Sequence, residues 1–185
     1  ERYFYMGQAH TANVAVIGKN SPACSPMTDA CATSLKKTAL LGFSADCSLT
    51  LFYDRRNRAV GVCHAGWKGA LLNVYEALFR RMSLEFGTRP GDLFAGVGPC
   101  VSRRNYPVGE ELIARFRSLY GRPVSRFYSR SGGKYFFDLA SVLEFQLEEL
   151  GVKNREFAGL CTYENPSLLY SHRRGDEGRF AVCAL

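Results

Sequence analysis

The chain contains only three histidines, and this scarcity limits where imidazole chemistry can take place. They are His10, His64 and His172, far apart along the sequence. His64 ends an apolar run and precedes the glycine-rich turn 65–69, which leads into an amphipathic segment. Backbone N–H groups at such strand-to-helix turns attract anions, and glycines let a ligand approach the backbone closely. An ordinary tight turn with a hydrogen-bonded histidine is the alternative, and the spacing does not separate the two.

Cys47 lies in Ala45-Asp46-Cys47, a short segment between two apolar runs. A thiolate there could ligate a metal or act as a nucleophile, whereas a lone cysteine is more often a buried structural thiol. Asp46 could orient a metal ligand or simply shape the turn. Two histidines and one cysteine form one of the three-ligand sets of catalytic zinc, with a fourth position open to water. The sequence leaves open whether His10, Cys47 and His64 meet.

Cations gather near the end of the chain, where Ser171-His172-Arg173-Arg174 precedes a glycine-bounded segment. A hydroxyl beside consecutive guanidinium groups suits the binding of phosphate or carboxylate. A charged surface hairpin is the alternative interpretation of the same residues.

The composition is that of an ordinary soluble globular protein. Of 185 residues, 46% are hydrophobic and 22% are charged, and the length fits one domain over residues 1–185. Seven cysteines, an odd number with no CxxC pair, argue against a disulfide framework and a zinc ribbon. We therefore expect a reducing compartment, namely the cytoplasm.

The charge distribution limits the class of partner. The formal net charge of +7 suits an anionic substrate. The basic pairs are scattered and are not interleaved with aromatic residues, so we expect no nucleic-acid partner. No apolar run is long enough to cross a bilayer, so we expect no membrane partner. Few dimer signals are visible, and we expect a monomer.

Short apolar runs alternate with amphipathic segments, without a strict strand–helix–strand rhythm. This mixture predicts an α+β fold (mixed α/β layers) in which helices flank a central mixed β-sheet. The expected helices run from the turn 66–69 to about Phe86, over 108–120, and from an N-cap at Asp138 to Leu150. The expected strands cover 13–17, 38–43, 48–53, 59–64, 93–97, 157–160 and 179–185.

In their order along the chain, these pieces resemble the YfiH family, the laccase-domain or "polyphenol oxidase" proteins now described as purine nucleoside phosphorylases. The most specific piece is His64-Ala65-Gly66-Trp67-Lys68-Gly69 downstream of Ala45-Asp46-Cys47. The other matching pieces are Gln8-Ala9-His10, Thr28-Asp29-Ala30, Gly98-Pro99, Tyr106-Pro107-Val108-Gly109, Asp138-Leu139, Cys161-Thr162, Ser171-His172-Arg173-Arg174 and Gly178-Arg179. Three positions depart from the family pattern: Thr11 replaces Gly, Lys68 replaces Arg, and His172 replaces Tyr.

The resemblance implies that His10, Cys47 and His64 hold a zinc ion, with Cys47, His64 and Asp46 at the catalytic centre. It implies a YfiH-like fold, similar to that of the cytotoxic necrotizing factor toxins. Family members also carry a segment ahead of the Q-V-H motif that contributes to the pocket, and we expect this chain to lack it.

The activities implied by the resemblance are phosphorolysis of adenosine, inosine, guanosine and methylthioadenosine, and deamination of adenosine. The small-molecule substrates are therefore a purine nucleoside and phosphate. The candidates for holding these substrates are Lys68, Ser171, Arg173 and Arg174, most of them cations suited to a phosphate group.

Three other functions stay open at this stage. Cys47 and His64 could form a nucleophile and base, as in a Cys–His hydrolase, including one that edits peptidoglycan precursors. Copper at a His₂Cys site with axial Met6 would suit a polyphenol oxidase, although a multicopper enzyme needs more imidazoles than three. A non-catalytic binding domain is the last alternative.

Overall fold

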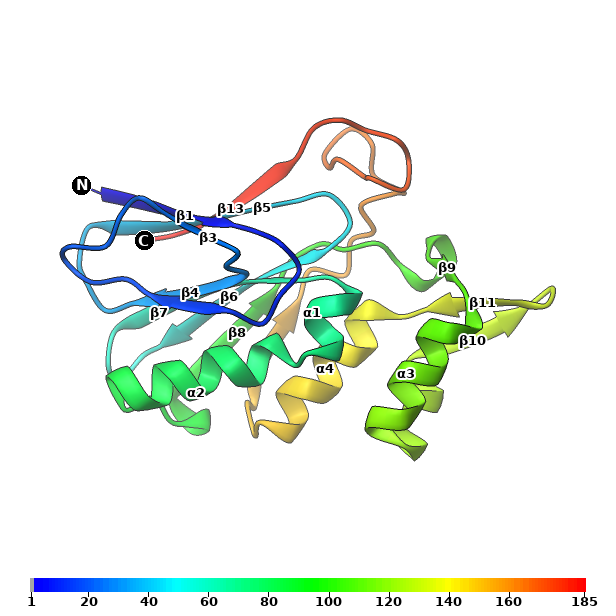
Figure 1. Cartoon of the computed structure of the whole chain (residues 1–185), viewed down its shortest axis with the longest axis horizontal. Helices are drawn as coiled ribbons and strands as arrows, with labels where there is room; N and C mark the ends of the chain where they lie inside the picture. Colours follow the sequence, from blue (N-terminus) through cyan, green and yellow to red (C-terminus); the bar gives the residue numbers. More distant parts are fainter. Residues whose placement is uncertain (1) are drawn as a thin grey trace.

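The structure, a computed structural model, describes residues 2–185 and is built in layers (Figure 1). A six-stranded mixed sheet forms the middle layer. In spatial order its strands are β12 (Asn154–Phe157), β8 (Leu93–Val97), β6 (Ser48–Asp54), β7 (Ala59–Ala65), β4 (Ala30–Thr33) and β2 (Val14–Val16). The expected mixed α/β class with a central mixed sheet is confirmed.

A smaller mixed sheet packs on one face of the middle layer, and helices cover the other (Figure 1). The smaller sheet consists of β13 (Phe180–Ala184), β5 (Thr38–Ser44), β1 (Arg2–Gly7) and β3 (Cys24–Pro26). The α-helices are α1 (Trp67–Leu71), α2 (Val74–Phe86), α3 (Glu110–Tyr120) and α4 (Leu139–Glu149), and short 3-10 turns cover Pro90–Asp92, Arg103–Asn105 and Arg122–Arg126. Beside α3, the third sheet joins β10 (Tyr128–Ser131), β11 (Lys134–Phe137) and β9 (Pro107–Val108).

Two hydrophobic cores hold these layers together. Between the two larger sheets, alternate residues of the strands point inward, with Phe4 of β1, Leu40 of β5 and Val62 of β7 almost fully buried. Between the middle sheet and the helices, the larger core includes Tyr75, Leu78 and Phe116. The site described below lies where strands of both larger sheets end.

The helix expected to run to about Phe86 is divided in two. Asn73 adopts the left-handed conformation, with φ of 52°, and its side chain accepts a hydrogen bond from Glu76 N, so it N-caps α2. The apolar spacing predicts α2 correctly, but it does not reveal the break between α1 and α2. The break separates α1, which faces the site, from α2, which packs on the sheet.

Other differences arise where sequence pattern is weak. The expected helix 108–120 begins at Glu110, because Pro107–Val108 pairs with β11. The late strand expected over 157–160 lies at Asn154–Phe157. Strands β1, β3, β4, β10 and β11 were not expected. Strands β3, β4, β10 and β11 are only three or four residues long, and exposed residues interrupt the apolar pattern of β1. The N-cap at Asp138 is confirmed, since its carboxylate accepts from Ser141 N.

Within residues 2–185, every helix is too short or too polar to span a lipid bilayer.

Candidate metal centre and its cavity

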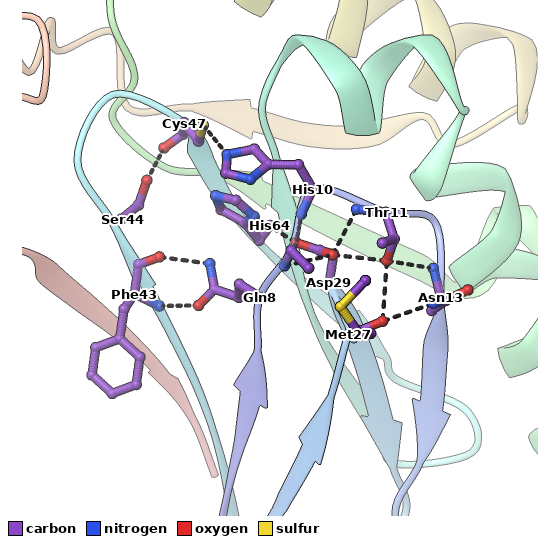
Figure 2. Close-up of polar contacts among 11 residues, drawn as sticks. Gln8, His10, Thr11, Asn13, Met27, Asp29, Phe43, Ser44, Cys47 and His64 are labelled. Atoms are coloured by element: carbon purple, nitrogen blue, oxygen red, sulfur yellow. Dashed lines mark hydrogen bonds and ion pairs between the residues drawn. The ribbon is translucent and has the colours of Figure 1, made fainter.

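Three side chains from separate elements converge at one edge of the sheets (Figure 2). His10 follows β1, Cys47 ends the turn between β5 and β6, and His64 lies near the end of β7. One potential ligand atom from each lies within 4.8 Å of the other two. Cys47 Sγ and His10 Nε2 are 3.7 Å apart, and the two imidazole centroids are 5.0 Å apart. The tertiary structure thus brings together the three residues that the sequence leaves separate.

The donor set fits a tetrahedral metal. Two ligand atoms bound at 2.0–2.3 Å to one tetrahedral ion lie about 3.5 Å apart, close to the separation of Cys47 Sγ and His10 Nε2. Two imidazoles and one thiolate suit zinc or copper, and leave one position for water or substrate. His10, Cys47 and His64 are the residues that could hold such an ion.

Asp29 organises two of these three side chains (Figure 2). Its fully buried carboxylate accepts a hydrogen bond of 2.9 Å from His64 Nδ1, which leaves Nε2 of that ring free to face a metal. It also accepts from the backbone N–H groups of Ala9, His10 and Thr11. These bonds hold the turn in which His10 takes the left-handed conformation, with φ of 60°.

The hydrogen bonds of Asp29 keep it ionised. Desolvation acts to raise the pKa of this carboxyl, but the bonds from His64 and Thr11 outweigh it and hold the pKa below its usual range. A carboxylate–histidine pair of this kind fixes the tautomer and increases the basicity of a metal-binding imidazole.

Gln8 ties the His10 segment to the strand that leads to Cys47. Its side-chain amide donates to Phe43 O at 2.7 Å and accepts from Phe43 N at 2.8 Å, as a peptide group would in a sheet. The pairing of β1 with β5 therefore continues one step beyond the strand, close to the site.

The protonation states of the metal-free cluster argue against a free nucleophile. Burial, assisted by the charges of Asp46 and Asp29, raises the pKa of the Cys47 thiol to about 12. Burial and the neighbouring His64 lower the pKa of His10. At neutral pH the uncomplexed thiol keeps its proton, so Cys47 alone is not an activated nucleophile.

Gly66 makes the room for Cys47. It precedes the first turn of α1, and a Cβ at this position would lie 2.5 Å from Cys47 Sγ and 3.3 Å from His10 Cδ2. Glycine is required here because the backbone passes directly beside two potential ligands.

We expect Gly66→Ala to weaken metal binding at least about tenfold, because the new methyl group displaces Cys47 or His10 from its place. Gly69→Ala is the matched control, since its Cβ would meet its nearest neighbour, Val74, at an ordinary 3.4 Å. Titration of the metal-free proteins with zinc against a competing chelator measures both. Equal affinities in the two variants would contradict the expectation.

Asp46 anchors the Cys47 turn to the C-terminal part of the chain. It is buried and takes the left-handed conformation, with φ of 88°. Its carboxylate accepts from Thr162 Oγ1 at 2.5 Å and from Arg173 N at 2.6 Å, while its carbonyl accepts from Val101 N at 2.9 Å. The carboxylate therefore supports the loop that carries Cys47 and makes no hydrogen bond to His10 or His64 in this structure.

An open cavity of about 820 Å³ lies over the three side chains. Its lining combines aromatic and other apolar side chains with several cations, which suits a substrate that carries an anionic group. Its lining residues are Met6, Gln8, His10, Phe43, Ser44, Ala45, Asp46, Cys47, His64, Trp67, Lys68, Val101, Tyr106, His172, Arg173 and Arg179.

Two of the sequence-predicted substrate residues are in this lining. Lys68 Nζ lies 5.5 Å from the centre of the Trp67 ring. The Arg173 guanidinium lies 4.8 Å from the centre of the Tyr106 ring and donates to Pro107 O. Both cations keep donors for a ligand while resting on aromatic faces.

Ser171 and Arg174 lie behind the cavity wall. The guanidinium of Arg174 donates to the carbonyls of Thr162, Tyr163 and Leu169 and pairs with Asp176. Ser171 is fully buried, and its hydroxyl accepts from Arg174 N. These two residues shape the loop that presents Arg173.

Two further residues emerge only from the structure. Asp29 and Arg179 fall within matching pieces of the family pattern, but sequence alone assigned no role to either. Arg179 lines the cavity, and its charge lowers the pKa of Cys47 against the larger effect of burial. The buried contact between Asp29 and His64 joins residues 35 positions apart, so no local pattern reveals it.

The chain belongs to the family described as "multi-copper polyphenol oxidoreductase laccase", whose model matches residues 1–185. This agrees with the resemblance seen in the sequence motifs.

Curated relatives of the chain carry the name purine nucleoside phosphorylase, among them proteins of Bacillus subtilis and Streptomyces coelicolor. YlmD of Bacillus subtilis is 34% identical over 157 residues, which cover 82% of this chain and 55% of the relative. SCO2081 of Streptomyces coelicolor is 33% identical over 184 residues, which cover 97% of this chain and 73% of the relative. The chain thus spans little more than half the length of the Bacillus relative.

Solved structures show the same fold. The Bacillus licheniformis hypothetical protein YfiH superposes with a TM-score of 0.90 at 27% identity, covering 98% of this chain and 73% of that protein. YlmD of Geobacillus stearothermophilus superposes with a TM-score of 0.91 at 23% identity, covering 99% and 73%.

Proposed function

We propose that this protein is a zinc-dependent purine nucleoside phosphorylase acting on adenosine, inosine, guanosine and methylthioadenosine. The convergence of His10, Cys47 and His64 beneath a cavity that carries cations is the observation that carries the proposal. The names of the curated relatives supply the substrate class. The free state of all seven cysteines fits a reducing compartment, and we propose a monomer in the cytoplasm.

Zinc fits this chain better than copper. The family name refers to several copper ions, but the chain has three histidines, and His10 and His64 belong to one cluster. Met6 lines the cavity, as an axial copper ligand would require, but a multicopper oxidase needs further imidazole clusters. A bound zinc ion would supply a Lewis acid with an open position, which suits deamination of adenosine as a second activity.

Other residues in and around the cavity would bind the substrates and position the metal ligands. Lys68, Arg173 and Arg179 bring positive charge to the cavity, where they would hold phosphate and offset its charge during attack on the ribose. Trp67 and Tyr106 offer aromatic surface beside these cations. Asp29 orients His64. Asp46 holds the turn that carries Cys47 next to the loop that carries Arg173.

A Cys–His hydrolase, including one that edits peptidoglycan precursors, is the alternative. It would need a thiolate at Cys47, whereas burial raises the pKa of that thiol. A metal bound at the cluster would also occupy the thiolate.

The test is to purify the protein without added metal, measure its metal content, and incubate it with adenosine in the presence and absence of phosphate. We expect about one zinc per chain and formation of adenine and ribose 1-phosphate only with phosphate. Inosine formed without phosphate would report deamination. Bound zinc without either product would overturn the proposed function, and a metal-free active hydrolase would favour the alternative.

A further inference from the structure

Cys100 and Cys161 lie side by side in the fold and are not members of the metal cluster. Cys100 follows β8 and Cys161 follows β12, and the two form a parallel β-bridge. The bridge is held by Cys100 N donating to Leu160 O and Thr162 N donating to Cys100 O. Residues paired on neighbouring strands are about 4.8 Å apart, and side chains at paired positions share a face of the sheet. This separation falls within the Cα range of about 4.4–6.8 Å that a disulfide requires.

Both cysteines line one hollow of about 270 Å³ on the surface. Cys100 is 8% exposed and Cys161 is 6% exposed, whereas Cys31 and Cys63 are fully buried in the cores. A small oxidant can therefore reach this pair, but not the two core thiols.

The surroundings of the two thiols differ. Cys161 Sγ accepts hydrogen bonds from Ser102 N at 3.2 Å and from Asn105 Nδ2 at 3.6 Å. Donors of this kind stabilise a thiolate; against the effect of burial, the hydrogen bonds from Ser102 and from the backbone of Glu164 and Tyr163 lower the pKa of Cys161. Burial raises the pKa of Cys100 to about 12.

We propose that Cys100 and Cys161 are a redox-active pair that a hydroperoxide oxidises to a disulfide. The Cys161 thiolate attacks one peroxide oxygen, which breaks the O–O bond and yields a sulfenic acid and hydroxide. The Cys100 sulfur then attacks the Cys161 sulfur, and the sulfenic oxygen leaves as water after taking up the Cys100 proton. Overall, two thiols and one hydrogen peroxide give one disulfide and two waters.

The residues that follow the two cysteines connect the pair to the candidate metal centre. Val101 N donates to the carbonyl of Asp46, and Thr162 Oγ1 donates to its carboxylate. Asp46 directly precedes Cys47. Oxidation, by linking the two strands covalently and moving the side chains at 100 and 161, therefore acts on the loop of a metal ligand, a consequence that rests on the proposed function.

The test is to treat the zinc-loaded protein with hydrogen peroxide and map its disulfides by mass spectrometry without reduction. We expect a mass loss of about 2 Da per chain, that of two hydrogens, reversed by dithiothreitol. Trypsin places Cys100 in peptide 82–103 and Cys161 in peptide 156–173, each with a single cysteine, so the linked pair is identified directly. Cys100→Ser and Cys161→Ser should each abolish the linkage.

Cys183→Ser is the matched control, since Cys183 is exposed and should leave the 100–161 linkage unchanged. Sulfinic acid at Cys161 without a linked peptide, or linkage to any other cysteine, would overturn the proposal. Release of zinc to a coloured chelator, compared between oxidised and reduced protein, tests the coupling separately. Equal release rates would overturn the coupling, and the linkage map does not depend on that result.

Discussion

Cys47→Ala is expected to remove the bound metal and nucleoside turnover together, as are His10→Ala and His64→Ala. Each substitution deletes one of three ligand atoms that lie within 4.8 Å of one another. Even the hydrogen-bonding partners of metal ligands contribute about 10–100-fold to affinity, so loss of a ligand should cost more than about 100-fold. Metal analysis of the purified variants and a phosphate-dependent adenosine assay measure the two effects.

His172→Ala is the control for these variants. His172 lines the same cavity but is not part of the cluster, so its removal should leave the metal content near that of the wild-type protein. If the three ligand variants keep their zinc, or if His172→Ala loses it, the assignment of the ligands is wrong. Turnover that survives loss of the metal would instead favour a metal-independent role for the cavity.

Asp29→Asn is expected to lower metal affinity by about 10–100-fold while the protein still folds. The amide keeps the shape of the side chain but loses the charge, and it keeps only one acceptor oxygen. It therefore cannot accept both from His64 Nδ1 and His10 N, which bond to Oδ1, and from Thr11 N, which bonds to Oδ2. Either the imidazole or the His10 segment loses part of its support. Competition with a chelator of known zinc affinity measures the loss.

Asp54→Asn is the matched control. Asp54 is also fully buried and its carboxylate accepts from the backbone of Arg56 and Asn57, but it lies in the turn at the other end of β6 and β7. Its substitution should destabilise the fold and leave zinc affinity within about threefold of the wild-type value, because it touches no ligand. A similar loss of affinity in both variants would show a general effect of stability.

The ionised carboxylate of Asp29 should make the free energy of unfolding depend on pH. Because the folded-state pKa of this carboxyl is depressed, its stabilising contribution is complete above the unfolded value of about 4 and is lost as pH falls through the lower folded value. The metal-free Asn variant should therefore lose less stability than the wild-type protein between about pH 5 and about pH 2. Denaturant unfolding across this range measures the difference.

The class of fold and most of the longer helices and strands could be predicted from the sequence alone. Apolar spacing of three or four residues located α2, the N-cap at Asp138 located α4, and apolar runs bounded by turn formers located β5, β6 and β7, because all of these are local patterns. The sequence also supplied the candidate ligand types, through the scarcity of histidine and the glycine-rich turn after His64.

Which of these side chains lie in contact depends on how the elements pack and could not be predicted from the sequence. His10, Cys47 and His64 come from three segments, and their meeting depends on the pairing of β1 with β5 and of β6 with β7. Arg174 joins the same cationic run as Arg173, yet it is turned inward to bind backbone carbonyls. Asp29 and Gly66 act through buried contacts with residues distant in sequence. Such contacts depend on packing between elements, so no periodic pattern in the sequence predicts them.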